Sequence, residues 1–409
     1  MGTMNLDKTA SVESAEINKF IYDENQPLKS QKGKKLQWVL SALDKASSCP
    51  ASVFMPDKTE VKLGHKKSKP EFQLHLNNEK GLAALTSLDE VTLAEAYIKG
   101  DIEISGDFMK VLDLRHAISD NHPVLDFLRK IKPRILGQVK DDRNAIKEHY
   151  EFDDDFYMVI LDETRTYSQG VYESDDEDLL TAMKRKLDYI IDSCHLKQGS
   201  RVLDVGGGWG AFTEYAGKKG IEVTSLTIAD RSEDYLNRLI KDKNLPCQVV
   251  KQNFLEFNSN EKFDAIVILG VIEHMPYYDK VVKKLESLLK PNGFAYFDGS
   301  AARSKFEFNT FLNRYIYPGN HCTLSIHDFL AEVQKSDMEL LSVHTDRHSY
   351  YLTCKAWAEK MEANRVMIIE RWGRELYAKF LLYLWGVAHN FYHNQLQAYR
   401  LVLTLNPAS

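Results

Sequence analysis

The stretch Val202-Leu-Asp-Val-Gly-Gly-Gly-Trp-Gly-Ala-Phe212 joins a short apolar segment to a glycine-rich turn. It predicts a strand, a turn and the start of a helix, in that order. Gly206, Gly208 and Gly210 let the backbone turn sharply and approach a ligand closely, and a helix N-terminus favours a negatively charged group. The stretch therefore indicates a site for a nucleotide-like cofactor. Taken alone, such a turn suits a dinucleotide and S-adenosylmethionine equally.

Helices and strands alternate after this turn, which predicts a parallel sheet. The expected elements are a helix at Phe212–Lys219, strands at Glu222–Thr227, Gln248–Val250 and Phe263–Leu269, a helix at Tyr278–Leu289, a turn at Lys290–Gly293 and a strand at Phe294–Asp298. This order fits an α/β, Rossmann-like fold.

The end of each strand helps to separate the two cofactors. A Rossmann dehydrogenase needs an acidic residue at the end of the second strand, but that strand ends in Thr227-Ile228-Ala229, and Asp230 comes late. Asp204 instead ends the first strand, where it can act through the loop on the ammonium group of S-adenosylmethionine. The pattern favours a class I methyltransferase over a dehydrogenase.

The bulk composition is that of a soluble enzyme. The 409 residues carry a formal net charge of −6, which argues against a nucleic-acid partner. The five cysteines are scattered, without Cys-x-x-Cys or His pairing, so we expect neither disulfides nor a metal site. No targeting segment is recognisable, so we expect a cytoplasmic protein. The apolar run Phe380–Ala388 is too short to span a bilayer.

The chain divides into four predicted parts. Residues 1–25 are polar and expected to be disordered, and 26–130 form a small α+β domain. Residues 131–147 form a basic linker, and 148–409 form the cofactor-binding domain.

A second signal precedes the first strand. Its two segments, His149–Tyr157 and Leu161–Gly170, are rich in aromatic, acidic and hydroxyl side chains. Such segments suit a lid over a ligand, but the first one also fits an ordinary amphipathic helix with acidic caps.

Together these motifs resemble the cyclopropane-fatty-acyl-phospholipid synthases and the mycolic-acid cyclopropane synthases. The similarity extends over nearly the whole chain beyond its first few dozen residues, including the lipid-contacting N-terminal domain of the bacterial phospholipid enzymes. The matching stretches are His149-Tyr150 with Asp155-Phe156-Tyr157, Leu161–Ser168, Val202–Gly210, Glu273-His274, Tyr315–Gly319, Gln397–Leu405 and Glu95–Asp107.

The resemblance implies transfer of a methyl or methylene group from S-adenosylmethionine to the double bond of an unsaturated acyl chain, most simply in a phospholipid at a membrane surface. The product would be a cyclopropane or methyl-branched chain formed through a carbocation. Aromatic faces can stabilise a cation, and a base must then remove a proton. Candidates for the aromatic wall are Tyr150, Phe156, Tyr167, Tyr350 and Tyr351.

The resemblance also implies the site residues. The cofactor-binding candidates are Tyr167, Ser168, Asp204, Gly206, Gly208, Gly210, Thr227, Ser232, Asn253 and Phe254. Asn253 stands where relatives have Asp, and its amide oxygen is expected to accept a bond from the adenine amino group. The catalytic candidates are Gln169, Glu273, Asp298 and Tyr350, at positions where the family uses Cys, Glu, His and Tyr to bind a bicarbonate ion as the base.

Two of these four positions differ from the family. Gln169 can still donate to an anion, but Asp298 beside Glu273 would add negative charge where bicarbonate should bind. One hypothesis is that Asp298 or Glu273 replaces bicarbonate as the base, and the other is that the anion site is lost and a different product forms. A soluble substrate and a non-catalytic lipid-binding protein remain alternatives. A homodimer is also left open, and the sequence specifies neither the acyl chain nor the double-bond position.

Overall fold

The computed structural model describes residues 31–64, 68–118, 154–304, 310–317 and 322–406. The expected disordered segment 1–25, the linker 131–147 and the His149-Tyr150 pair lie outside these residues. The chain forms two compact units. The smaller comprises Met1–Asn121 with Ile369–Leu382, and the larger comprises His122–Ile368 with Tyr383–Ser409.

The smaller unit contains a four-stranded mixed sheet with the strand order β2-β1-β3-β4. Strands β1 and β3 are parallel, and the other pairs are antiparallel. Its elements are α2 (Gln31–Ala46), β1 (Ala51–Phe54), β2 (Glu60–Leu63), β3 (Phe72–Leu76), α3 (Glu79–Ser87), α4 (Glu90–Lys99), β4 (Ile102–Gly106), α5 (Phe108–Asp113) and η1 (Leu114–Ala117).

The sequence explains these elements locally. The alternation in Phe72-Gln-Leu-His-Leu76 buries every second side chain of β3. Asn78 and Asp89 cap the first turns of α3 and α4 by accepting bonds from backbone N–H groups. Gly100 ends α4 in the left-handed conformation, where glycine has no steric cost.

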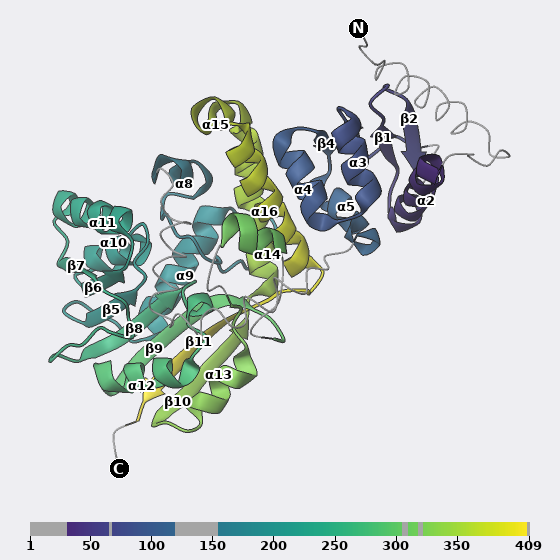
Figure 1. Cartoon of the computed structure of the whole chain (residues 1–409). Helices are drawn as coiled ribbons and strands as arrows, with labels where there is room; N and C mark the ends of the chain where they lie inside the picture. Colours follow the sequence, from purple (N-terminus) through teal and green to yellow (C-terminus); the bar gives the residue numbers. More distant parts are fainter. Residues whose placement is uncertain (1–30, 65–67, 119–153, 305–309, 318–321, 407–409) are drawn as a thin grey trace, which may run out of the picture. The chain divides into compact units, whose positions relative to one another are not determined.

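The larger unit contains a seven-stranded sheet with the order β10-β11-β9-β8-β5-β6-β7 (Figure 1). The five strands from β5 to β9 run parallel to one another, and β11 is antiparallel to β9 and β10. The strands are β5 (Arg201–Val205), β6 (Glu222–Thr227), β7 (Cys247–Lys251), β8 (Phe263–Leu269), β9 (Leu289–Ala301), β10 (Met338–Thr345) and β11 (Gln397–Leu405).

Helices follow or precede these strands in the chain. They are α8 (Asp154–Ile160), α9 (Leu179–Ser193), α10 (Ala211–Lys218), α11 (Asp230–Lys243), η2 (Ile272–His274), α12 (Tyr278–Leu288), η3 (Leu312–Ile316), α13 (Ile326–Val333), α14 (Arg347–Ala363), α15 (Arg365–Trp372) and α16 (Arg374–Tyr392). Of these, α10 and α12 lie where the sequence predicts helices.

The sheet is buried on both faces. Ile266 and Ile268 of β8 pack into one apolar cluster, and Ala265 and Val267 pack into another. This is the pattern of a central parallel strand covered by helices on either side. The predicted α/β, Rossmann-like domain with a smaller N-terminal α+β domain is confirmed.

One expected boundary was wrong. The turn expected at Lys290–Gly293 lies inside β9, which begins at Leu289. Leu289 pairs with Phe263, but the next pair joins Phe294 to Ala265, so four residues of β9 bulge out of the ladder.

No described helix is both long and apolar enough to cross a membrane.

Candidate active site

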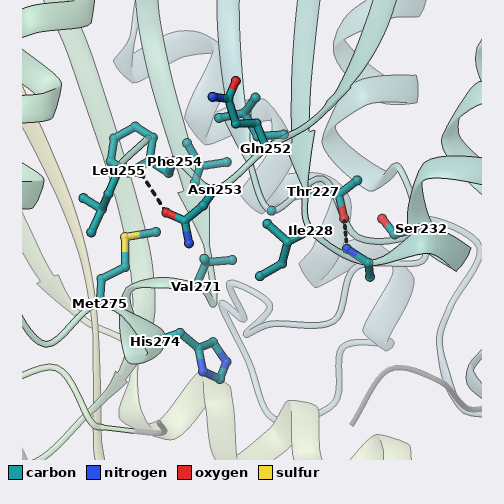
Figure 2. A pocket seen from close by; sticks show the side chains of 14 residues that line it. Thr227, Ile228, Ser232, Gln252, Asn253, Phe254, Leu255, Val271, His274 and Met275 are labelled. Atoms are coloured by element: carbon teal, nitrogen blue, oxygen red, sulfur yellow. Dashed lines mark hydrogen bonds between the residues drawn. The ribbon is translucent and has the colours of Figure 1, made fainter. Parts of the chain in front are cut away.

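A pocket opens at the carboxyl ends of the parallel strands, where the strand order reverses between β5 and β8. Such a switch point is the usual ligand site of an open α/β sheet. Figure 2 shows lining side chains at or after the ends of β6, β7 and β8, such as Thr227, Asn253 and His274. The lining residues are Val205, Gly206, Leu226, Thr227, Ile228, Ala229, Ser232, Gln252, Asn253, Phe254, Leu255, Val271, His274 and Met275.

Half of the ten predicted cofactor residues line this pocket. They are Gly206, Thr227, Ser232, Asn253 and Phe254. The other five, Tyr167, Ser168, Asp204, Gly208 and Gly210, do not line it.

Glycine is required where the loop meets the pocket. Gly206 has φ +77°, and a Cβ there would lie 2.5 Å from Cγ2 of Val271, which itself lines the pocket. Gly208 and Gly210 also have positive φ, and the Gly208 carbonyl accepts a 2.7 Å bond from the Ser232 hydroxyl. The loop therefore adopts a conformation that other residues take only under strain.

Asp204 is buried at the end of β5. Its Oδ2 accepts bonds from Thr213 of α10, at 3.0 Å, and Ser225 of β6, at 3.3 Å. Burial raises the pKa of Asp204 to about 6, although both hydroxyls oppose this. The carboxylate thus connects the end of β5 to α10 and β6.

Asn253 is placed differently from the expectation. Its amide oxygen already accepts a 2.9 Å bond from the backbone N–H of Leu255, marked by a dashed line in Figure 2. This hydrogen bond therefore stabilises the turn that follows β7. The prediction that this oxygen serves the adenine amino group needs a second bond to the same atom.

Arg165 connects the segment before the sheet to the glycine loop. Its Nε donates to the Trp209 carbonyl at 3.0 Å, and its Nη2 pairs with Glu214 of α10. Arg165 itself has φ +64°, an uncommon conformation for a residue with a side chain. Sequence reasoning missed this residue, because neither its backbone angle nor its distant partners leave a local signal.

Glu273 lies in η2, between the pocket-lining residues Val271 and His274. It is buried, and its Oε1 accepts bonds from the Ser300 backbone N–H at 2.7 Å and hydroxyl at 3.1 Å. Its Oε2 has no hydrogen-bond partner among the described residues. Burial raises the pKa of Glu273 to about 7, and the Asp298 charge adds to this rise. Such a carboxyl group can accept a proton near neutral pH.

Asp298 is fully buried in β9, and its Oδ2 pairs with the Lys186 ammonium at 3.1 Å. Its Oδ1 accepts a 3.0 Å bond from the Gly270 N–H. Its charge raises the pKa of Glu273, in the direction expected from the sequence. Sequence reasoning missed the ion-pair partner, because Lys186 stands 112 residues earlier in the chain.

Gln169 also has a different environment from the one expected. Its amide N–H group donates to Asp346 at 3.1 Å and to the Tyr399 carbonyl at 3.3 Å. Asp346 in turn pairs with Arg400 at 2.9 Å. The donor expected to hold an anion is therefore occupied, and the Gln169 oxygen is the atom without a partner among the described residues.

The aromatic candidates separate into two groups. The Tyr350 ring stacks on Phe391 at 4.5 Å, and burial followed by the charges of Cys354 and Glu273 raises its pKa. Tyr167 contacts the rings of Tyr157, at 5.4 Å, and Trp357, at 5.2 Å. Phe156 is buried and contacts the Tyr157 ring. Tyr351 instead lies against the exposed Tyr392.

The strand order and the pocket at its switch point define a Rossmann-like, class I methyltransferase. A family model described as mycolic acid cyclopropane synthetase matches residues 138–401, and the chain belongs to this family of S-adenosylmethionine-dependent methyltransferases. A second model, for a domain of unknown function, matches residues 39–122.

Individual relatives agree with this assignment. The chain is 25% identical to the cyclopropane-fatty-acyl-phospholipid synthase of Escherichia coli, covering 88% of this chain and 97% of that protein. It is 25% identical to a sphingolipid C9-methyltransferase of Candida albicans, covering 70% of this chain but only 60% of that protein. The mycolic acid cyclopropane synthase CmaA1, solved with SAH and CTAB, shares the fold with a TM-score of 0.59 at 24% identity, over 64% of this chain and 98% of that one.

Proposed function

We propose that this protein transfers a methyl or methylene group from S-adenosylmethionine to the double bond of an unsaturated acyl chain, forming a cyclopropane or methyl-branched product in a phospholipid. One observation carries the proposal: Glu273 stands in the sequence between Val271 and His274, which line the switch-point pocket, and its Oε2 has no hydrogen-bond partner in the described part of the chain. The names of the E. coli and Candida relatives, which act on acyl phospholipids and sphingolipids, support an unsaturated lipid as the substrate class.

The pocket fits the methyl donor. Its lining is mainly apolar, with Thr227, Ser232 and Asn253 as polar groups that could orient a nucleoside. S-adenosylmethionine would supply an electrophilic methyl group. The protein holds that group close to a double bond and excludes water, because an isolated alkene is a weak nucleophile.

Glu273 would then act as the base. Addition of the methyl group leaves a positive charge on the neighbouring carbon, and loss of a proton from the new methyl closes a cyclopropane ring. The free Oε2 of Glu273 can take that proton, whereas both oxygens of Asp298 already accept bonds. Tyr350 would present an aromatic face to the cation. Bicarbonate is not needed in this scheme.

A face of α2 supports contact with a lipid surface. Trp38 is 63% exposed, and the exposed Lys34 and Lys45 lie one and two turns away on the same face of the helix. A tryptophan flanked by lysines suits the interface of an anionic membrane. We propose that the protein is cytoplasmic and binds the membrane peripherally through this face.

The test uses the purified full chain, S-adenosylmethionine with an isotopically labelled methyl group, and vesicles of unsaturated phospholipid. Mass spectrometry should find labelled lipid that has gained one CH2. A cyclopropane product has a saturated ring in place of the double bond, whereas a methylated olefin keeps the double bond. If no labelled phospholipid forms, calorimetry with S-adenosylmethionine distinguishes between two explanations. Binding of S-adenosylmethionine without labelled phospholipid would indicate another substrate, such as a sphingolipid or a soluble molecule. Absence of binding would indicate a non-catalytic protein.

A further inference from the structure

A fully buried lysine pairs with Asp298, near the proposed base. Lys186 of α9 is surrounded by apolar neighbours on its helix, including Met183, Leu187 and Ile190. Its ammonium group bonds to Asp298 at 3.1 Å and to the Ser168 hydroxyl at 2.6 Å. A charge removed from water in this way is costly unless its partners are well placed. Its retention in a core position therefore indicates a role other than packing.

The ion pair is close to Glu273 along β9. Ser300, which holds Oε1 of Glu273, stands two residues after Asp298. Gly299 lies between them, and a Cβ there would come within 3.0 Å of the same Glu273 oxygen. The Asp298 charge raises the pKa of Glu273, after burial itself.

Two tyrosines, a histidine and a cysteine are further titratable residues beside Glu273 in the described part of the chain. Electrostatic interaction with Glu273 raises the pKa of Tyr350 on α14 and of Tyr278 on α12, although burial is the main cause for both. His274 follows Glu273 in η2, and the Cys322 backbone N–H donates to the Glu273 carbonyl at 2.7 Å. The charged group that acts on the Glu273 pKa is the Asp298 carboxylate, and Lys186 is the ion-pair partner of Asp298.

We propose that Lys186 and Asp298 are positioning residues for proton removal by Glu273: their ion pair holds Ser168 against β9 and fixes the charge beside the Glu273 carboxylate. The Asp298 charge favours the protonated form of Glu273, and the Lys186 ammonium offsets part of that effect. This inference rests on the proposed role of Glu273 as the base.

The sign of each effect follows from the charges. Glu273 can act as a base only when ionised, so kcat should rise with pH through its pKa of about 7. D298N leaves the Lys186 ammonium uncompensated, which favours the carboxylate form of Glu273. The midpoint of the pH profile should then fall by about one unit or more. K186M/D298N removes both charges and should return the midpoint towards the wild-type value.

The experiment compares the pH profiles of kcat for the full-length wild type, D298N and K186M/D298N. If the two residues are only structural, the double variant should have a lower kcat than D298N. The midpoint of its pH profile should then not return towards the wild-type value. An unchanged midpoint in D298N, or an equal shift in the double variant, would overturn the proposal. If D298N does not fold, K186Q replaces it: the midpoint should rise, and an unchanged or lower midpoint contradicts the proposal.

A second readout does not depend on turnover. The infrared band of the protonated Glu273 carboxyl group, identified by its loss in E273Q, can be titrated in each protein without lipid. If the wild type makes no product, the proposed function fails, but this titration still tests the ion pair. If product forms and the band does not move among the variants, the inference about Lys186 and Asp298 fails alone.

Discussion

The cofactor pocket and the buried charges around Glu273 are built in different ways. The pocket is made by short loops that directly follow consecutive strands, and its shape depends on local backbone such as Gly206. The charges come from residues that are distant in sequence: Lys186 pairs with Asp298, which stands 112 residues later. The ligand-binding loops are thus determined by local sequence, whereas the environment of the proposed base depends on contacts between residues that are distant in sequence.

The largest expected effect removes the base and leaves the pocket intact. E273Q keeps the size and the Ser300 contact of the side chain but cannot take up a proton. We expect kcat to fall by about 10²–10⁴-fold, with the affinity for S-adenosylmethionine unchanged by calorimetry. E222Q, which changes an exposed glutamate of β6, is the matched control and should retain full activity. Equal activity of E273Q and the wild type would remove Glu273 from the mechanism.

This contrast also explains what the sequence could predict. The strands Glu222–Thr227 and Phe263–Leu269 match their predicted bounds because apolar runs and flanking turns mark them locally. The strand at Phe294–Asp298 was predicted too short, since Lys290-Pro-Asn-Gly293 carries turn residues that the structure accommodates as a bulge.

The proposed site was harder to predict for the same reason. Glu273 and Asp298 could be singled out from their motifs, but the charge on Asp298 is compensated by Lys186. Helical spacing places Lys186 on the apolar face of α9, yet the sequence does not show which residue it pairs with. The direction of the Gln169 amide depends likewise on Asp346 and the Tyr399 carbonyl. Long-range pairing of this kind leaves no periodicity in the sequence.

The second prediction breaks the pocket and leaves the buried charges intact. G206A places a methyl group against Val271, at a backbone conformation that costs alanine about 1–2 kcal/mol. We expect calorimetry to show at least about tenfold weaker binding of S-adenosylmethionine, or about 1.4 kcal/mol.

The matched control for this variant is G199A. Gly199 has a similar positive φ, but a Cβ there meets no atom within 4 Å. G199A should lose stability from the backbone strain while keeping its affinity for S-adenosylmethionine. If both variants lose affinity equally, the effect is one of general stability and the assignment of the pocket is weakened.

The smallest expected effect concerns binding to the lipid surface. It should change neither the cofactor pocket nor the buried charges around Glu273. W38S should weaken binding to anionic phospholipid vesicles roughly fivefold, about 1 kcal/mol, because one amphipathic ring leaves the interface. Flotation assays at moderate salt can measure this. Y392S changes an exposed aromatic residue of the larger unit and serves as the control. Equal losses in the two variants would argue against a specific role for α2.

The dependence of the reaction on bicarbonate tests the central claim most directly, since the claim is that a carboxylate of the protein removes the proton. Wild-type protein should be assayed with S-adenosylmethionine and unsaturated phospholipid in buffer depleted of carbon dioxide, with and without added bicarbonate. With Glu273 as the base, the initial rate is the same in both buffers. A rate that collapses on depletion and recovers when bicarbonate is restored would contradict the account.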